Sequence, residues 1–384
     1  MSEWQYDLVS FVDRIEEAAK IEEYARLLLD DRLIHPRTVI FTGAHGIGKS
    51  WLLSHLHQHL STWNNLRLLM IDLATFSGTR DLSCVMHDII AHANHKLFDR
   101  PIAAERSFAQ SAAELIQEIK RVVLPNRPLV VMLDSVYESP WELLGLLENH
   151  ILAPLIVERN VFIVMAGRGR PYPFKAIDLR QRAEFITLQP FAQNWTREQL
   201  SKISLPPQTA FNDIHLRSHG NPKANRLLAQ SNDLHSMTAQ LLTDMLTPIP
   251  SEDYHKLWDY LLALSVPRFF DYSVIPPILA AYFDDEAWLV KQRRDIREIA
   301  DALIASGYAY WDSELSFYTL DTPTRYWCLD YLKLEDPERW RRTTQAQLRL
   351  LQQWVEEAPQ SQLFWQAEID YHDQEIRDMT DSDA

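Results

Sequence analysis

The most informative stretch of the chain reads Gly43-Ala44-His45-Gly46-Ile47-Gly48-Lys49-Ser50 and fits the pattern G-x-x-x-x-G-K-[ST]. It lies between an apolar stretch at residues 38–41 and an amphipathic one at residues 51–60. A strand that feeds a glycine-rich turn, which then opens into a helix, is the context that a phosphate-binding loop requires. The glycines let successive backbone N–H groups point at one anion, and the helix N-terminus adds a favourable field. The stretch therefore predicts a binding site for a nucleoside triphosphate.

Two residues at the end of this loop have specific chemical roles. Lys49 is expected to reach the β- and γ-phosphates, and the Ser50 hydroxyl is expected to ligate Mg²⁺. We expect the whole loop, and Trp51 directly after it, to contact the nucleotide. The sequence contains no Asn/Thr-Lys-x-Asp motif of the kind that recognises guanine, so ATP is favoured over GTP.

The composition is that of a globular protein with an acidic surplus. At 384 residues, the chain is long enough for two or three domains. Hydrophobic residues make up 46% and charged residues 24%, and the formal net charge is −15. A protein that grips the nucleic-acid backbone usually carries a basic surplus, because its affinity comes largely from phosphate neutralisation. The acidic balance therefore disfavours duplex binding as the main role.

The sequence also indicates a location. It has no uninterrupted apolar run long enough to cross a bilayer, and its first residues lack the pattern of a secretory signal. Cys84 and Cys328 are far apart, and we expect both to be small buried apolar residues without a disulfide. A cytoplasmic protein with no membrane partner is expected.

Short apolar runs, separated by helical patterns, predict a parallel sheet. The runs occupy residues 38–41, 66–73, 129–134, 161–166 and 184–188. The helical patterns include residues 82–98, 103–122 and 141–159. Strands that alternate with helices are typical of an α/β fold in which helices cover both faces of the sheet. We assign this three-layer P-loop core to residues 1–192.

Beyond the core, the strand signal disappears. Residues 193–250 are expected to form a helical lid, with helices at 197–203, 210–218, 223–230 and 234–246. Residues 251–335 follow the order of a winged helix, with helices at 254–264, 273–281 and 295–305 and then an aromatic hairpin at 307–311 and 315–320. Residues 336–384 are expected to form a helical C-terminal extension with an acidic tail.

Three charged residues follow predicted strands and complete the candidate site. Asp134 ends the strand at 129–134, where P-loop proteins place the acid of the Mg²⁺ shell. Glu138 is a candidate for activating the attacking water, although a solvated loop acid explains it equally well. Arg168 follows the strand at 161–166, at the sheet edge where ligands bind, and is a candidate γ-phosphate contact. A surface arginine is the alternative.

Four histidines in or near the loop are a weaker signal. They are His45, His55, His57 and His59. His55 and His59 have the i, i+4 spacing of a metal pair, but no Cys or further His completes a site nearby. We expect all four histidines to lie at the surface.

Three further motifs resemble those of STAND-class signal transduction ATPases. Phe11-Val12-Asp13-Arg14 is similar to their N-terminal "FVGR" motif, with Asp13 in place of glycine. Leu188-Gln189-Pro190-Phe191 resembles the "L-x-P-L/F" junction between their sheet and lid, and Gly220-Asn221-Pro222 resembles their "GNP" motif. The order and spacing of the three motifs carry the resemblance across residues 11–230.

The resemblance implies an adenine site and a domain plan. In STAND proteins the N-terminal motif and the proline pack around the adenine, which implies adenine contacts for Val12, Arg14 and Pro222. Proline suits this role because it offers a rigid apolar face and has no N–H group. The family further implies an AAA+-like or NB-ARC-like core, of the bacterial or archaeal kind, with a winged helix directly after the lid.

Two positions depart from the family pattern. Ser135 stands where many relatives carry a second acid that activates water, so slow ATP hydrolysis is expected and useful turnover stays open. In the segment 320–325, Asp321 replaces the histidine of the "M-H-D-x-x-R" motif, and Thr322 replaces its aspartate. A carboxylate repels phosphate, so Asp321 is not expected to bind the nucleotide.

By resemblance, the chain is a molecular switch. Exchange of ADP for ATP with Mg²⁺ would shift the domains, expose oligomerisation surfaces and drive a signalling or antiviral-defence assembly. The residues outside the three predicted domains are too few for the sensor array and effector domain that relatives append. A separate sensor or effector protein is therefore expected as a partner, together with a nucleotide-dependent homo-oligomer.

Two alternatives stay open. One is a DNA-linked AAA+ ATPase, such as an initiator or a transposition regulator, whose winged helix binds DNA. The basic residues that would serve it are Lys291, Arg293, Arg294 and Arg297. Asp295 and Glu298 interleave with them, which is more typical of a solvated helix face. The other alternative is a scaffold that binds ATP and scarcely turns it over.

Overall fold

The computed structural model describes most of the chain. The described residues are 11–76, 81–100, 107–123, 127–169, 171–203, 211–230, 254–312, 315–357 and 362–382. The helix predicted at 234–246 lies outside them. The chain divides into two units, Met1–His215 with Gly220–Arg226 and Leu216–His219 with Leu227–Ala384.

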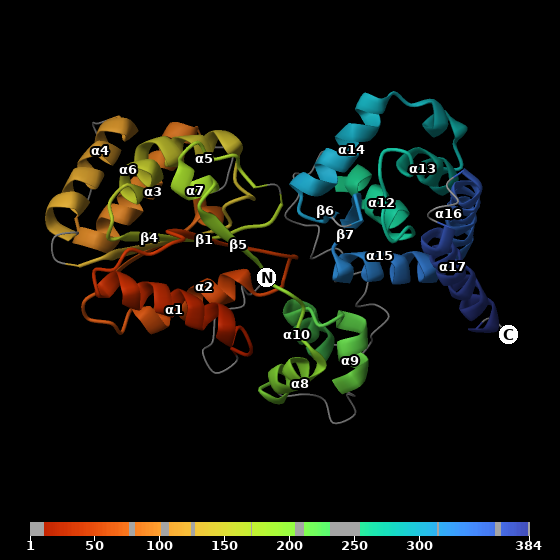
Figure 1. Ribbon diagram of the computed structural model, residues 1–384, viewed down its shortest axis with the longest axis horizontal. Helices are drawn as coiled ribbons and strands as arrows, with labels where there is room; N and C mark the ends of the chain where they lie inside the picture. Colours follow the sequence, from red (N-terminus) through yellow and green to blue (C-terminus); the bar gives the residue numbers. More distant parts are fainter. Residues whose placement is uncertain are drawn as a thin grey trace. The chain divides into compact units, whose positions relative to one another are not determined.

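The first unit is built on a sheet of five strands (Figure 1). These are β1 (Thr38–Thr42), β2 (Arg67–Asp72), β3 (Leu129–Asp134), β4 (Val161–Ala166) and β5 (Ala183–Thr187). Their order is β2-β3-β4-β1-β5, and every neighbouring pair is parallel. The structure confirms all five predicted strands. Since the carboxyl ends of parallel strands lie at the same edge of a sheet, the loop after β1 and the acid that ends β3 are at the same edge.

Helices cover both faces of this sheet, as the sequence predicts (Figure 1). One face packs against α1 (Ile15–Leu29) and α2 (Lys49–Leu60). The other packs against α3 (Leu82–Phe98), α4 (Phe108–Glu118), α5 (Trp141–Leu147), α6 (Ala153–Ile156) and α7 (Ile177–Arg180). Val39 and Phe41 of β1 belong to the first core, whereas Ile40 belongs to the second, because successive side chains of a strand point to opposite faces.

Two predicted helices differ from continuous α-helices. A π-helical segment, η3 (Ile119–Val123), extends α4, and another, η4 (Glu148–Leu152), separates α5 from α6. Pro154 stands in the first turn of α6, where its missing N–H interrupts the regular hydrogen-bond ladder. A short 3₁₀ helix, η2 (Leu73–Phe76), follows β2.

The described lid contains α8 (Gln193–Ser201), α9 (Phe211–Ser218) and α10 (Pro222–Gln230). These match three of the four predicted lid helices. A buried amide network joins α8 to α10. The Gln199 side chain donates to the Pro222 carbonyl at 3.0 Å, and the Asn225 side chain donates to Gln199 Oε1 at 2.8 Å. Most of the lid therefore belongs to the same unit as the sheet.

The second unit begins its described part with a winged helix. It consists of α12 (Tyr254–Ser265), α13 (Ile275–Phe283), the 3₁₀ helix η5 (Glu286–Val290), α14 (Arg293–Ala305), and the antiparallel strands β6 (Ala309–Asp312) and β7 (Phe317–Leu320). Phe270 adds an antiparallel bridge to Tyr318 of the hairpin. The predicted order of three helices followed by a hairpin is confirmed.

Three long helices complete the second unit: α15 (Thr322–Glu335), α16 (Pro337–Glu357) and α17 (Gln362–Ser382). Asp321 caps α15, since its carboxylate accepts a hydrogen bond from the Thr324 N–H at 3.2 Å. The Arg325 guanidinium donates to the carbonyls of Val266 and Pro267. In this chain, the segment that resembles the "M-H-D-x-x-R" motif therefore has a structural role within its own unit.

The two cysteines are free, and only one matches its prediction. Cys328 is buried, as expected, and burial raises the pKa of its thiol. The expectation for Cys84 is wrong, because this residue is exposed on the side of α3 that faces away from the buried stripe of that helix. Within the described ranges, none of the helices combines the length and the apolar content that crossing a membrane requires.

Candidate nucleotide-binding site

The loop between β1 and α2 has the backbone that a phosphate cradle needs. Gly43, Gly46 and Gly48 all have left-handed φ angles, of 138°, 74° and 103°. L-residues rarely adopt this conformation, so glycine is required there. At Gly46 the space is restricted as well, because an added Cβ would lie 2.6 Å from Lys223 Cβ.

Lys49 begins α2 with its side chain folded over the loop. Its Nζ donates to the carbonyls of Gly43 and Ala44 at 2.7 and 2.9 Å. An ammonium group held this way lies against the phosphate cradle. The phosphate contact of Lys49 stays a prediction.

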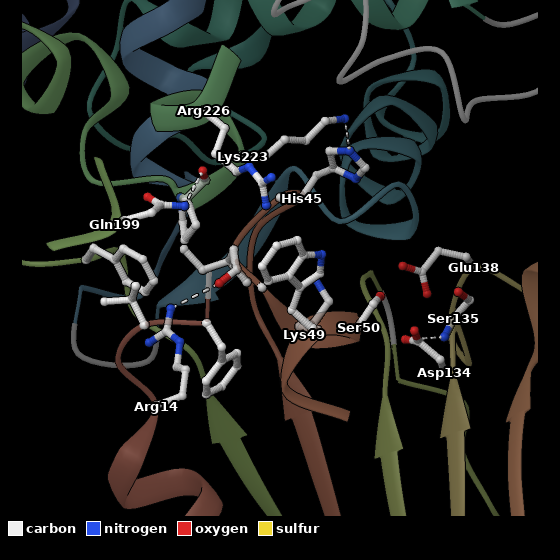
Figure 2. Close-up of a pocket in the computed structure, with 18 residues that line it drawn as sticks. Arg14, His45, Lys49, Ser50, Asp134, Ser135, Glu138, Gln199, Lys223 and Arg226 are labelled. Atoms are coloured by element: carbon white, nitrogen blue, oxygen red, sulfur yellow. Dashed lines mark hydrogen bonds between the residues drawn. The ribbon is translucent and has the colours of Figure 1, made fainter. Parts of the chain in front are cut away.

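Asp134 and Ser50 bring together an acid and a hydroxyl (Figure 2). Asp134 ends β3 with only 5% of its surface exposed. Burial raises the pKa of Asp134 to about 6; a hydrogen bond from Ser50 opposes this shift, and the nearby charge of Asp72 adds to it. Mg²⁺ prefers such oxygen ligands, and a dication would compensate for the buried negative charge. These two residues therefore fit the predicted Mg²⁺ site.

The raised pKa of Asp134 predicts a pH-dependent cost to stability. The folded, metal-free protein binds the Asp134 proton more tightly than the unfolded chain, so stability falls as pH rises from 3.8 to about 6. The full cost above that range is roughly 3 kcal/mol. Asp134→Asn is therefore expected to raise the melting temperature at pH 8 in EDTA and to leave it unchanged at pH 4.

Thermal unfolding of wild type and Asp134→Asn at the two pH values checks this expectation. Asp99→Asn is a suitable control, because the Asp99 side chain is 91% exposed. An equal response of both variants at pH 8 would show that the buried charge of Asp134 has no special cost.

The opposite end of the cavity is apolar and holds the N-terminal motif. Val12 is buried, and Phe11 and Phe191 also line the cavity. Asp13 and Arg14 have φ angles of 62° and 65°. The glycine of the family motif suits this left-handed conformation, and aspartate is among the few other residues that tolerate it.

Arg14 connects this motif to two other parts of the site. Its Nη2 donates to the carbonyl of Ile47 in the loop at 3.0 Å (Figure 2). It also donates to the carbonyl of Gln189 in the sheet–lid junction at 2.6 Å. The guanidinium carbon lies 5.1 Å from the centre of the Phe191 ring. Arg14 thus fixes the wall of the cavity, and its adenine contact stays a prediction.

The lid binds directly to the phosphate loop through the start of α10. The Asn221 side chain donates to the His45 carbonyl at 2.8 Å, and the Lys223 N–H donates to the Gly46 carbonyl at 3.2 Å. Asn221 Oδ1 accepts from the N–H groups of Lys223 and Ala224 at 3.1 and 3.2 Å, so it also caps α10. One buried amide therefore holds both the helix and the loop.

His45 departs in part from the expectation that the four histidines lie at the surface, because it is half-buried and lines the cavity. Lys223 of the lid packs against it, with its Nζ 3.0 Å from His45 Nε2 (Figure 2). Burial and the charges of Arg168, Lys223 and Lys49 lower the pKa of His45 well below its usual value. The imidazole is therefore neutral, and its Nε2 accepts from the ammonium, which has only donors.

The other histidines do not form a metal site. The rings of His55 and His59 lie 6.3 Å apart between centroids, and His55 stacks on Phe11 at 4.0 Å. Across the described ranges, no group of three or more His, Cys, Asp or Glu side chains is arranged to hold a metal. Mg²⁺ does not need such a group, because phosphate oxygens and water supply most of its ligands.

These elements enclose a cavity of about 300 Å³. The predicted residues that line it are Val12, Arg14, His45, Gly46, Ile47, Gly48, Lys49, Ser50, Trp51, Asp134, Glu138 and Pro222. Gly43 and Ala44 support Lys49 from outside this lining. Arg168 is buried after β4, where its N–H donates to Glu138 Oε2 at 3.0 Å. Its γ-phosphate contact stays a prediction.

The sequence alone did not identify several lining residues. They are Phe11, Ser135, Phe191, Gln199, Lys223 and Arg226, of which Phe11, Ser135 and Phe191 had been noted only within motifs. Arg226 lies one turn after Pro222 on α10, and its guanidinium carbon is 4.7 Å from the centre of a Trp51 ring. Its i, i+4 spacing from Pro222 is a signal that could have placed it on the same helix face.

Comparisons with known proteins add little beyond the fold. No protein-family model matches the chain, and no curated protein matches its sequence. The chain is similar in structure to Cdc6p from Pyrobaculum aerophilum, with 12% identity over 85% of this chain and 97% of that chain, at a TM-score of 0.44. It is also similar to Orc1 from Aeropyrum pernix, solved in complex with DNA, with 14% identity over 85% of this chain and 93% of that chain, at a TM-score of 0.42.

A third similar structure is RuvB, the Holliday junction branch migration motor of Thermotoga maritima. It has 14% identity over 85% of this chain and 97% of that chain, at a TM-score of 0.39. Likenesses this weak carry no argument about ligands or partners. The strand order, the loop and the acid that ends β3 define an α/β P-loop NTPase fold, which is followed by a helical lid and a winged helix.

Proposed function

We propose that this protein is an ATP-dependent molecular switch that binds ATP and Mg²⁺ between the loop and the lid. The observation that carries the proposal is that one cavity is lined both by the phosphate loop and by Pro222, Lys223 and Arg226 of α10. A ligand that contacts two elements has different affinities for their different arrangements. The nucleotide state is therefore expected to set the position of the lid.

In this proposal each end of the nucleotide has its own set of residues. Lys49 binds the β- and γ-phosphates, while Ser50 and Asp134 hold Mg²⁺, which neutralises phosphate charge. The cations of α10 face the same cavity and favour a ligand with several negative charges. Val12, Arg14 and Pro222 hold the adenine end.

The proposed activity is slow hydrolysis of ATP to ADP and phosphate. Glu138 and Arg168 are the residues that the sequence assigns to the γ-phosphate region, and the hydrogen bond between them keeps them close together. Ser135 supplies no carboxylate at the position after Asp134. Slow turnover suits a protein in which ATP acts as a timer for an assembly with itself or with a sensor or effector partner. The motif resemblance is the support for a signalling or defence role.

A DNA-linked ATPase, such as an initiator or a transposition regulator, is the second candidate function. The winged helix supports it, since Arg294 of α14 has 84% of its side chain exposed and Tyr310 and Trp311 of the hairpin are also exposed. Against it, Arg294 pairs with Glu298 at 3.1 Å and Arg297 pairs with Asp301 at 3.5 Å, which neutralises two of the arginines.

Hydrogen exchange of the full chain with no nucleotide, with ADP and with a non-hydrolysable ATP analogue tests the switch. We expect both nucleotides to protect residues 43–50, and the ATP analogue to change the protection of α10 relative to ADP. Mass photometry under the same conditions then tests for nucleotide-dependent assembly. Identical α10 exchange with both nucleotides would overturn the switch while leaving nucleotide binding intact.

Adding duplex DNA to the same samples separates the two candidates. Salt-dependent duplex binding that is lost in the charge-reversal variant Arg293→Glu/Arg294→Glu would favour the DNA-linked function. A nucleotide-dependent change in mass without duplex binding would favour the assembly switch.

A further inference from the structure

We propose that Asp72 and Ser135 form a proton relay that activates the attacking water, in place of the second acid that this site lacks. The inference rests on the proposed function, because it requires ATP in the cavity. It assigns roles to two residues that the sequence left without any. Ser135 would contact the water, and Asp72 would act through Ser135.

The geometry of Ser135 is the first support. Its Oγ donates to Asp72 Oδ1 at 2.9 Å, and its backbone N–H donates to Asp134 Oδ1 at 2.8 Å. Ser135 lines the cavity directly beside the predicted Mg²⁺ acid (Figure 2). A serine hydroxyl that donates to a carboxylate can accept a proton from water as it gives up its own.

The backbone of Ser135 is the second support. Its φ angle is 55°, in the left-handed region that serine rarely adopts. Such conformations cost of order 1–3 kcal/mol and cluster at functional sites. Here the unusual turn lets one residue bond to two carboxylates at once, with its N–H on Asp134 and its hydroxyl on Asp72.

The sheet fixes the position of Asp72. Asp72 ends β2 in direct register with Asp134, the last residue of β3. Its Oδ1 also accepts a hydrogen bond from the Ala74 N–H at 3.0 Å, which orients the carboxylate toward Ser135. Asp72 stands behind Ser135, outside the cavity lining.

The proposed step balances in atoms and electrons. The water oxygen bonds to the γ-phosphorus while the bond to the β–γ bridging oxygen breaks, and ADP leaves with that electron pair. One water proton passes to Ser135 Oγ as the Ser135 hydroxyl proton passes to the Asp72 carboxylate. Asp72 then releases the proton to solvent, so ATP and water yield ADP, phosphate and one proton.

Glu138 is the competing base, and the structure limits it. Its Oε2 accepts the backbone N–H of Arg168 at 3.0 Å, so one carboxylate oxygen is committed to fixing the loop after β4. Asp134 Oδ1 is likewise engaged, because it accepts the Ser135 N–H at 2.8 Å. We therefore compare Asp72 and Glu138 directly, using the same carboxylate-to-amide change.

The experiment measures steady-state ATP turnover, ATP affinity and melting temperature for wild type, Asp72→Asn, Ser135→Ala, their double variant and Glu138→Gln. General-base catalysis contributes about 10²–10⁴-fold, so Asp72→Asn and Ser135→Ala are each expected to lower turnover at least 100-fold. The double variant is expected to match the single variants, because the two residues act as a unit. Glu138→Gln is expected to lower turnover less than Asp72→Asn.

Two readouts separate a relay from a merely structural role. ATP affinity is expected to stay within threefold of wild type in both single variants, and the Asp72→Asn protein is expected to retain bound ATP where wild type accumulates ADP. Asp99→Asn serves as the exposed control for the amide change.

Several results would overturn the relay. The relay would be overturned if Asp72→Asn or Ser135→Ala turned over ATP at the wild-type rate. It would also be overturned if Glu138→Gln lowered turnover more than Asp72→Asn. The relay would also be overturned if wild type turned over ATP no faster than Lys49→Ala. In that case, tight ATP binding to wild type would show that the proposed nucleotide binding still holds. Absence of ATP binding to wild type would instead overturn the proposed function itself.

Discussion

Lys49→Ala is expected to lower the affinity for ATP at least 100-fold. A hydrogen bond to a charged group contributes about 1.5–3 kcal/mol, and Lys49 is expected to make more than one such bond to the β- and γ-phosphates. At 1.4 kcal/mol for each tenfold change, the loss of two bonds reaches this magnitude. Alanine can replace neither the charge nor the donors, so the loss is expected with ADP as well as with ATP.

The structure indicates that the Lys49→Ala protein will fold. Lys49 Nζ is shown bonding to the loop carbonyls of Gly43 and Ala44, and water can replace it there once the side chain is removed. Isothermal titration of Mg²⁺–ATP checks the affinity, and circular dichroism checks the fold. Lys96→Ala, at an exposed position of α3, is a matched control that should bind ATP like wild type. An unchanged affinity in a folded Lys49→Ala protein would contradict the assignment of this loop.

The parts of the fold with a local signal could be predicted from the sequence. The run at residues 129–134 is apolar up to its final acid and forms β3 with the predicted bounds, because a strand covered on both faces needs apolar side chains throughout. The helix at residues 82–98 also has its predicted bounds in α3. In contrast, local periodicity did not reveal the π-helical turn before Pro154, because the apolar pattern of residues 141–159 predicts one continuous helix and only the proline marks the interruption.

The candidate site shows the same division. Lys49, Ser50 and Asp134 could be predicted because their spacing and flanking strands are visible in the chain. The contacts of Asp72 with Ser135 and of His45 with Lys223 could not, because each depends on a partner brought close by the fold. Asp72 needs the pairing of β2 with β3, and the contact of His45 with Lys223 needs the lid to return to the loop.

Asn221→Ala is expected to lower the free energy of unfolding of the first unit by roughly 2–4 kcal/mol, because it removes a helix cap and leaves a buried acceptor without its donor. The greater effect is expected on the lid. Asn221 Nδ2 provides the side-chain bond to the His45 carbonyl, so its loss weakens the contact between the start of α10 and the loop and leaves it to the bonds that Lys223 makes to Gly46 and His45. Hydrogen exchange of residues 43–48 is expected to accelerate, and ATP affinity is expected to fall about tenfold.

Asn225→Ala is the matched control for this prediction. Asn225 is fully buried on the same helix, but its amide bonds to Gln199 Oε1 at 2.8 Å and to Thr196 Oγ1 at 3.3 Å, within the lid. Its removal is expected to destabilise the lid to a similar extent without accelerating exchange in residues 43–48. Equal loop exchange in the two alanine variants would mean that Asn221 does not hold the loop.

Asn221→Asp separates the cap from the contact with the loop. Aspartate keeps an oxygen that can accept from the N–H groups of Lys223 and Ala224, but it has no donor for the His45 carbonyl. It also places a negative charge beside the phosphate loop, which disfavours an anionic ligand. We therefore expect a smaller loss of stability than in Asn221→Ala and a larger loss of ATP affinity. The opposite order would mean that Asn221 acts on nucleotide binding through the stability of α10 and not through its bond to the loop.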